Sequence, residues 1–301
     1  MKYLITAIIF VCSLNPQKQD YGLNLEVGET YSQFYTAESK VEQTIMGMEQ
    51  TVTISLSSGV DFKVTQKMSD RYKMDVSYKE IEMIMNLPQG ETRVSTKEES
   101  DNPMSSMMKN MVGKSFQVEM LNNGKVTKVE NLENVFSNMF EGIPDLSEEQ
   151  KSQLVGQMMQ SYGEKAFKGN IEMITAILPA KKVSVGDSWT STTRLESGFA
   201  ADVNNTYTLA SSDASAVVIE GSSDIATDPT GSTTEVNGMK TSYELSGTMT
   251  ATYTLDPKTN WVLMGKVNQK MTGEAEIADS PQIPGGITIP MEITNLMTIG
   301  Q

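Results

Sequence analysis

Methionine is the residue type whose number and spacing stand out in this sequence. The chain of 301 residues holds 22 methionines, and many of them fall in short clusters. A thioether side chain is unbranched and polarisable, so it fills irregular apolar space and adapts to hydrophobic ligands of different shapes. One run has helical spacing and consists of Met104, Met107, Met108 and Met111. Such a run could line an adaptable apolar pocket, or it could simply fill the core of the fold.

Metal binding is a further interpretation of this run, because thioethers are good ligands for Cu(I). The spacing is equally typical of the apolar stripe of an amphipathic helix, which needs no metal. Acidic loops at 224–228 and 256–260 do not have the spacing of an EF-hand calcium loop, and tight turns account for them. We therefore expect no metal site and no cofactor.

The residues that carry out most catalysis are scarce. The sequence contains no histidine and one cysteine, which removes Ser-His-Asp and Cys-His catalysis and histidine-ligated zinc. Carboxylates such as Glu148 and Glu149 lie at a predicted helix start, where the helix dipole explains them. A pair of carboxylates of the glycosidase kind stays open, although the chain has only two tryptophans to act as sugar platforms. We expect a protein without catalytic residues.

Charge limits the partners. The chain has 24 Lys and Arg against 38 Asp and Glu, for a net charge of -14. Nucleic acids and anionic membranes are bound through clustered basic residues, and an acidic chain is repelled by them. We therefore expect no nucleic-acid partner.

The N-terminus predicts export. Met1 and Lys2 precede an apolar run from Tyr3 to Leu14, which is too short to span a hydrocarbon layer about 30 Å thick. We interpret residues 1–19 as a signal peptide and expect a periplasmic or secreted protein without a transmembrane segment. A lipid anchor at Cys12 is the less favoured alternative, because Val11 stands where lipoprotein signals have a small residue.

Alternation of apolar and polar residues dominates the rest of the chain. It follows Tyr72, Met74, Val76 and Tyr78, then changes parity at Ile81 and continues through Met83 and Met85. This change predicts one long strand interrupted by a β-bulge. Turn sequences at 122–124, 228–231 and 256–260 predict hairpins in an antiparallel sheet with one buried face.

Four amphipathic segments interrupt the strands. Asn102 and Pro103 open a short helix over 103–111, and Leu132 begins a second apolar stripe that includes Phe136, Met139 and Phe140. A capping box at 147–150 opens a third helix, which carries Met158 and Met159, and a fourth runs from Phe167 towards Pro179. Because only one side of each segment is apolar, these helices must lie on the sheet.

A short motif occurs twice. Residues 27–31 and 185–189 both have the pattern Val, Gly, acid, hydroxyl, aromatic, and strands follow each of them. The pattern predicts a mainly β, α+β fold: a long curved antiparallel sheet from two related halves, with a helical connector on one face. The expected divisions are a first β half at 20–130, a connector at 131–179 and a second β half at 180–301.

These paired motifs, the exported start and the methionine-rich helices resemble an uncharacterised family of exported proteins from Bacteroidota, domain of unknown function 6263. No activity comes with this resemblance. At the level of the fold, the pattern is similar to LolA-like periplasmic carriers of lipoproteins and lipids. That likeness implies helices lying in the concavity of a curved sheet, and a fold does not fix a function.

The functional hypothesis from the sequence is a non-catalytic envelope protein that binds a hydrophobic small molecule or lipid between helices and sheet. The predicted pocket-lining residues are Met83, Met85, Met104, Met107, Met108, Met111, Phe136, Met139, Phe140, Met158 and Met159. The alternative is a structural component with a fully packed core, which meets a protein or glycan partner through an exposed row of threonines at 248–254.

Overall fold

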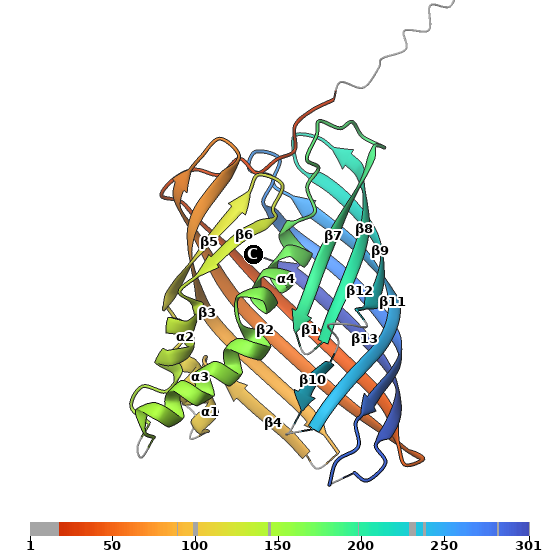
Figure 1. Cartoon of the computed structure of the whole chain (residues 1–301). Helices are drawn as coiled ribbons and strands as arrows, with labels where there is room; N and C mark the ends of the chain where they lie inside the picture. The colour runs from red at the N-terminus through yellow and green to blue at the C-terminus, as the bar shows by residue number, and fades with distance from the viewer. Residues whose placement is uncertain are drawn as a thin grey trace, which may run out of the picture.

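The protein is built on one large antiparallel sheet. The computed structural model describes residues 18–88, 90–98, 102–143, 146–197, 199–228, 233–236, 239–281 and 283–300. Within these residues there are 13 strands in a single sheet and four helices (Figure 1). The mainly β, α+β class predicted from the alternation is confirmed. The predicted signal peptide lies outside the described residues, apart from residues 18 and 19, as does Cys12.

The sheet is an antiparallel meander, in which most neighbouring strands follow one another along the chain and the first strand lies beside the last. Its path is β6-β5-β3-β2-β1-β13-β12-β11-β9-β8-β7, with β4 added on β3 and β10 on β11. The first and last strands pair, from Phe34 with Gly300 to Gln43 with Met291. Both halves of the chain therefore share one sheet, whose two edges are β6 and β7. The strands are β1 (Thr30–Ile45), β2 (Met48–Lys67), β3 (Arg71–Leu87), β4 (Gly90–Ser95), β5 (Ser115–Leu121), β6 (Val126–Glu130), β7 (Ser188–Ser197), β8 (Phe199–Ser212), β9 (Val217–Thr227), β10 (Thr233–Val236), β11 (Met239–Leu255), β12 (Val262–Ile277) and β13 (Ile287–Gly300).

The parity change predicted in the third strand is a bulge. Gly59 of β2 pairs with Glu80, whereas the next residue, Val60, pairs with Tyr78, so Lys79 is an extra residue on β3. A single extra residue restores the alternation on the other parity. As a result Tyr78 and Ile81 lie on the same face of the sheet.

The predicted hairpins are confirmed at 122–124 and 256–260, where β5 pairs with β6 and β11 with β12. The hairpin expected at 228–231 is wrong, because β9 and β10 both pair with β11 and not with each other. The reason is the length of β11. It extends past the end of β9, so β10 pairs with its first residues. Residues 229–232 themselves lie outside the described part of the chain.

All four predicted helices are present, as α1 (Pro103–Lys109), α2 (Leu132–Met139), α3 (Glu148–Tyr162) and α4 (Glu164–Thr175). The side chain of Asn102 accepts the Met104 N–H at 2.9 Å and begins α1. The capping box predicted at the start of α3 is formed by reciprocal bonds between Ser147 and Gln150. Local capping chemistry therefore fixes where these helices begin.

Helix α4 lies between the two edges of the sheet and contacts both β6 and β7 (Figure 1). On the β6 side, Glu172 accepts the backbone N–H of Val126 at 2.8 Å. On the β7 side, α4 comes so close that a Cβ on Gly169 would overlap the carbonyl oxygen of Arg194. The helix thus packs against both strands that end the main path of the sheet.

The N-terminal segment, residues 18–29, crosses the upper end of the sheet as drawn in Figure 1. Its Leu23 N–H donates to the Asn122 carbonyl at 2.6 Å, and its Asn24 N–H donates to the Thr259 carbonyl at 2.9 Å. It therefore joins the β5–β6 turn to the β11–β12 turn, which lie in different halves of the chain. Leu25 of this segment is fully buried.

The two Val-Gly motifs have the same backbone geometry. Gly28 and Gly186 both have a positive φ, of 95° and 90°. Their N–H groups donate to the carbonyls of Val64 and Leu209, each at 2.8 Å, and each of those residues returns an N–H to the acidic residue of the motif. An internal repeat stays a prediction, which this equivalence supports.

Candidate functional site

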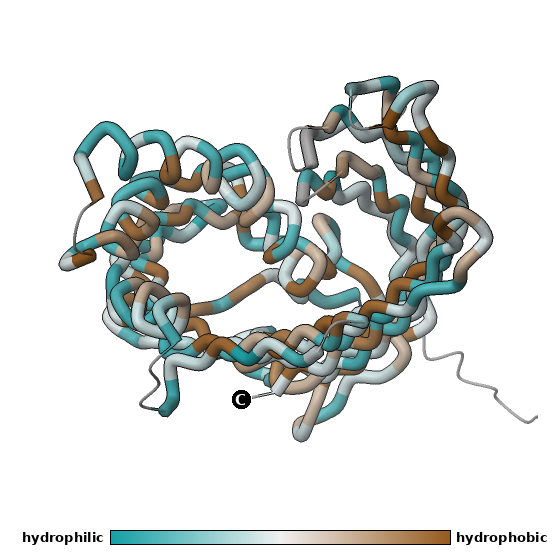
Figure 2. Tube along the Cα trace, turned by 90° about the horizontal axis from the view of Figure 1, so that it is seen from below, coloured by the Kyte–Doolittle hydropathy of each residue, from teal (hydrophilic) through white to brown (hydrophobic). Residues whose placement is uncertain are grey.

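We call the concave face of the sheet its inner face. Helix α4 covers the upper end of this face. Tyr253 of β11 donates its hydroxyl to the Met173 carbonyl of α4 at 2.9 Å, and the Trp189 indole of β7 donates to the Ile177 carbonyl at 3.1 Å. These contacts fix which side chains point inwards. Residues that pair across two strands lie on the same face of the sheet. The pairing registers therefore show which residues point inwards on the other strands. Figure 2, seen from below, shows the sheet as a strongly curved wall with the helices over one arm.

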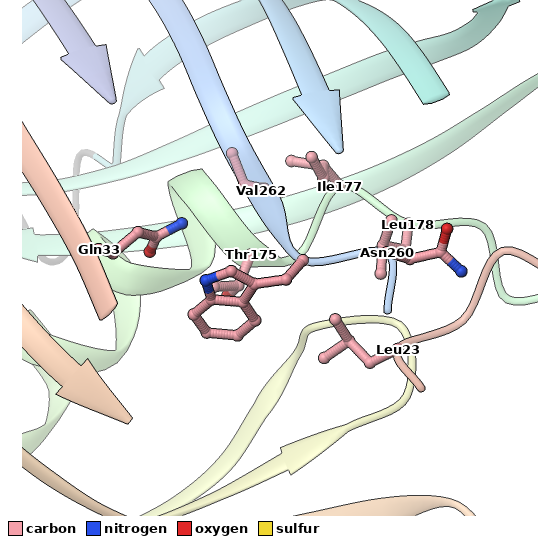
Figure 3. A pocket seen from close by; sticks show the side chains of 8 residues that line it. Leu23, Gln33, Thr175, Ile177, Leu178, Asn260 and Val262 are labelled. Carbon is pink, nitrogen blue, oxygen red and sulfur yellow. The ribbon is translucent and has the colours of Figure 1, made fainter. Parts of the chain in front are cut away.

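The upper part of this interior is solidly packed. Phe62, Val64 and Tyr253 are completely buried, and Trp261 packs against Phe62 with ring centroids 5.3 Å apart. A void of about 10 Å³ remains among Gln33, Thr175, Leu178 and Trp261 (Figure 3). A void of this size holds at most one water molecule. This void between α4 and the sheet is therefore too small for a lipid ligand.

The lower part of the inner face differs, because its apolar side chains keep part of their exposure. We name this set the lower inner face. Its members are Val41 of β1, Val52, Ile54 and Leu56 of β2, Met83 and Met85 of β3, and Met291 and Ile293 of β13. They are partners across adjacent strands and so form a continuous apolar surface, which is a candidate for ligand contact.

A row of polar side chains crosses the same inner face. Ser39 pairs with Asn295, and Asn295 pairs with Gln269. The next residue across the sheet is the apolar Met249 of β11, and beyond it lies Ser223 of β9. We name Ser39, Asn295 and Gln269 the polar triplet. On each strand an apolar inward residue stands on both sides of the triplet member, such as Val41 beside Ser39 or Ile293 beside Asn295. Polar groups are thus embedded in the apolar surface.

The hydrogen-bonding capacity of the triplet is only partly used. The Asn295 Nδ2 donates to Gln269 Oε1 at 2.7 Å. The Asn295 Oδ1 is buried and has no partner among the described residues. The Gln269 Nε2 donates to the Met271 sulfur at 3.3 Å, and a thioether is a weak acceptor. One acceptor and one weakly bonded donor therefore remain for another molecule.

The inward positions of the central strands hold no carboxylate, ammonium or guanidinium group. The inward positions of β1 from Tyr31 to Gln43, of β12 from Gly265 to Ile277 and of β13 from Ile287 to Ile299 carry no Asp, Glu, Lys or Arg. Charged residues of these strands, such as Lys270 and Glu292, point outwards and pair at 2.8 Å. Burial raises the pKa of the inward phenols Tyr35 and Tyr78, so both stay neutral.

The structure divides the residues predicted to line a pocket into three groups. Met111, Phe136, Met139 and Phe140 are buried in the main core. Met107, Met108, Met158 and Met159 are partly buried and pack against that core, whereas Met104 is 45% exposed. Only Met83 and Met85 belong to the lower inner face. A ligand site at the helix methionines stays a prediction.

Sequence reasoning missed the polar triplet and the contribution of β1, β2 and β13. A signal for the triplet existed, because Gln269 interrupts the apolar alternation between Val267 and Met271, and Asn295 does the same between Ile293 and Met297. A polar residue at a core parity indicates either a function or a specific hydrogen-bond partner. What the sequence did not show is that these positions are neighbours, since β1 and β13 are the two ends of the chain.

A second hollow lies at the upper end, outside the packed core. It is an open groove of about 710 Å³ between the N-terminal segment and the turns, with Asp20, Lys67, Asp70, Asn122 and Lys258 among its lining residues. Its lining is mixed in charge and largely polar. No group of three or more metal-ligating side chains occurs in the described part of the chain. None of the described helices is both long enough and apolar enough to cross a membrane.

Comparisons with known proteins give a family and two distant likenesses. The model of a family of unknown function (DUF6263) matches residues 69–262. No curated protein has significant sequence similarity to the chain. A structure described as lipid-protein interactions in lipovitellin is 9% identical over 92% of this chain, with a TM-score of 0.48; the match spans 25% of the lipovitellin chain. The COG4313 outer membrane channel from Pseudomonas putida F1 is 9% identical over 94% of this chain and 98% of its own, with a TM-score of 0.26. Neither likeness carries weight for function.

Proposed function

Since this chain belongs to the family of unknown function DUF6263, which brings no activity with it, we propose from the geometry that it is a non-catalytic exported protein that binds a hydrophobic ligand. The observation that carries the proposal is the lower inner face. Eight apolar side chains on β1, β2, β3 and β13 point into the concavity of the sheet and remain partly exposed. A continuous exposed apolar surface of this kind usually marks a binding site.

The two faces of the sheet support this assignment. The outer face of β11 carries Thr248, Thr250 and Thr252, which are exposed to water, whereas the inner face of the same strand carries Met249, Ala251 and Tyr253. Apolar area in contact with water costs about 25 cal/mol per Å², so a ligand that covers the lower inner face is favoured. The site thus suits a molecule with an extended apolar part.

A binding role without chemistry also agrees with the side chains available. The lower inner face and the polar triplet contain amides, a hydroxyl and apolar groups, and none of these is a general acid, a base or an activated nucleophile. The place of action in the proposal is the periplasm or the outside of the cell, which rests on the apolar N-terminal run.

Binding can be tested on the chain that begins at residue 18, with Nile red as an uncharged fluorescent probe. We expect saturable fluorescence enhancement in the wild type, and co-purified lipid in an organic extract analysed by mass spectrometry. Ile293→Glu places a charge on the lower inner face and should weaken probe binding at least tenfold. Thr294→Glu, on the exposed side of the same strand, is the matched control. No enhancement and no lipid in the wild type would reject the proposal.

A structural or interaction role is the second candidate, and the exposed threonine row on β11 is the observation that favours it. Regularly spaced threonines on a flat outer strand offer hydroxyls to a glycan or protein. Binding of glycans or of envelope proteins that is lost in Thr250→Glu, combined with unchanged Nile red binding, would support this role.

A further inference from the structure

The polar triplet has a property that a purely hydrophobic pocket would not need. Asn295, Gln269 and Ser39 stand on adjacent strands within the apolar surface, and all three keep part of their exposure. Burying an amide without a hydrogen-bond partner is unfavourable, because the group loses its hydrogen bonds to water. Such groups persist on a buried face when another molecule satisfies them.

Further polar atoms without partners lie deeper in the core, on the same face of β1. Gln33 is 1% exposed, and neither its amide nitrogen nor its amide oxygen has a partner among the described residues. The indole nitrogen of Trp261, beside the same small void, is also without one. The inner face therefore offers unused donors and acceptors at two levels, and those at Asn295 and Gln269 belong to residues that keep part of their exposure.

The charge of the face decides which ligands fit. A carboxylate or phosphate placed here would meet no basic side chain, and an uncompensated buried charge is strongly unfavourable. The net charge of -14 adds long-range repulsion against anions. A neutral group has no such penalty. A hydroxyl can donate to Asn295 Oδ1, and a hydroxyl or ester oxygen can accept from Gln269 Nε2.

We propose that the site selects an uncharged amphiphile, of the class of monoacylglycerols and other neutral lipids that carry hydroxyl or ester groups. The polar group hydrogen-bonds to Asn295 and Gln269, and the acyl chain lies along Val41, Ile54 and Ile293. This inference rests on the proposed function and specifies the ligand class for the same surface. Free fatty acids in their ionised form are excluded by it.

The test compares two probes that share one acyl chain. Monooleoylglycerol and oleate are titrated at pH 8, below their aggregation concentrations, against the protein loaded with Nile red. We expect monooleoylglycerol to displace the dye at a concentration at least tenfold lower than oleate. Equal or tighter displacement by oleate, or no displacement by either lipid, would overturn the inference and leave the hydrophobic site standing. Absence of Nile red binding would instead reject the proposed function.

Substitutions of Asn295 and Gln269 test whether their amides cause the preference for monooleoylglycerol over oleate. Asn295→Leu and Gln269→Leu should each reduce the preference for monooleoylglycerol over oleate at least fivefold, when both lipids are compared on the same variant. Asn268→Leu, on the exposed face next to Gln269, is the matched control and should keep the preference. If Asn295→Leu does not fold, Gln269→Met keeps the shape of the side chain and gives the same readout. An unchanged preference in folded triplet variants would contradict the assignment.

Discussion

Tyr72 is the residue that ties the N-terminal segment to the sheet. Its buried hydroxyl donates to the Leu23 carbonyl at 2.9 Å and accepts the Leu25 N–H at 3.2 Å. One phenol thus satisfies two backbone groups of a segment that has few such bonds of its own.

Removing this hydroxyl should loosen the segment. We expect Tyr72→Phe to lower the free energy of unfolding by about 1–3 kcal/mol, because two buried backbone groups lose their partner. Urea titration followed by tryptophan fluorescence measures the change. Tyr162→Phe, at a side chain that is 60% exposed, is the control and should leave stability unchanged. Equal stability of Tyr72→Phe and wild type would show that water replaces the hydroxyl.

Glu172 is a buried acid at the junction of α4 and β6. Burial raises its pKa above the ordinary value of 4.5, and the hydrogen bond from the Val126 N–H opposes this shift in part. An acid whose pKa is higher in the folded state holds its proton more tightly there. The stability that this group contributes is therefore present below pH 4.5 and is lost as the pH rises through the raised value.

Glu172→Gln removes the negative charge and keeps a side-chain oxygen that can accept the Val126 N–H. We expect Glu172→Gln to be more stable than wild type at pH 7, with a difference that disappears as the pH falls below 4.5. Thermal unfolding across this pH range measures it, with Glu164→Gln at the exposed start of α4 as control. A variant that is less stable at pH 7 would mean that the ionised carboxylate makes a net favourable contribution.

At the scale of elements, the docking of α4 depends on one glycine. Gly169→Ala would drive a methyl group into the backbone of β7 at Arg194, so we expect a loss of about 1–3 kcal/mol in urea titrations. Gly156 in the exposed part of α3 has no atom within 4 Å of the position of an added Cβ. Gly156→Ala should therefore be neutral or stabilising by up to about 1 kcal/mol. The same effect in both variants would contradict the close approach of α4 to β7.

The elements that the sequence predicts well are those with local causes. The caps at Asn102 and Ser147 begin helices, and the parity change after Tyr78 marks a bulge. The hairpin at 228–231 was predicted wrongly because alternation identifies the buried face of a strand and not its partner. Which neighbour β10 takes depends on the length of β11.

The candidate site could be predicted only in part for a related reason. Met83 and Met85 were identified from their parity on β3, and they do lie on the lower inner face. Methionine in the helical segments has the same composition signal, but there Met111 and Met139 are buried in the main core, because thioethers suit both roles. Asn295 and Ser39 are separated by nearly the whole chain, so no local pattern places them together.

At the scale of the whole molecule, the halves of the chain are joined by β1 with β13 and by α4 with β7. The link between them at Ala180 and Lys181 is exposed. We expect fragments 18–180 and 181–301, expressed together as separate chains, to assemble into a one-to-one complex, because the ladder from Phe34 to Gln43 does not need a covalent connection.

Light scattering with size-exclusion chromatography measures this assembly. Each fragment alone exposes an unpaired edge, at β1 or at β13, and should aggregate or stay partly folded. Two fragments that fold separately and do not associate would contradict a sheet shared by both halves. Ser39→Pro, which removes a backbone donor within the β1 ladder, should weaken the complex more than Ser215→Pro in an exposed turn.

The separation of charge between the two faces of the sheet has a consequence for where the protein can work. At 0.1 M, salt screens interactions between exposed charges that lie more than about 10 Å apart. The charged side chains of β1, β12 and β13 all lie on the outer face of the sheet. Affinity for a neutral guest is then set by dispersion, desolvation and amide contacts, none of which depends strongly on ionic strength. Under the proposed function, we expect the affinity for a neutral ligand to be the same at low and at high salt concentration.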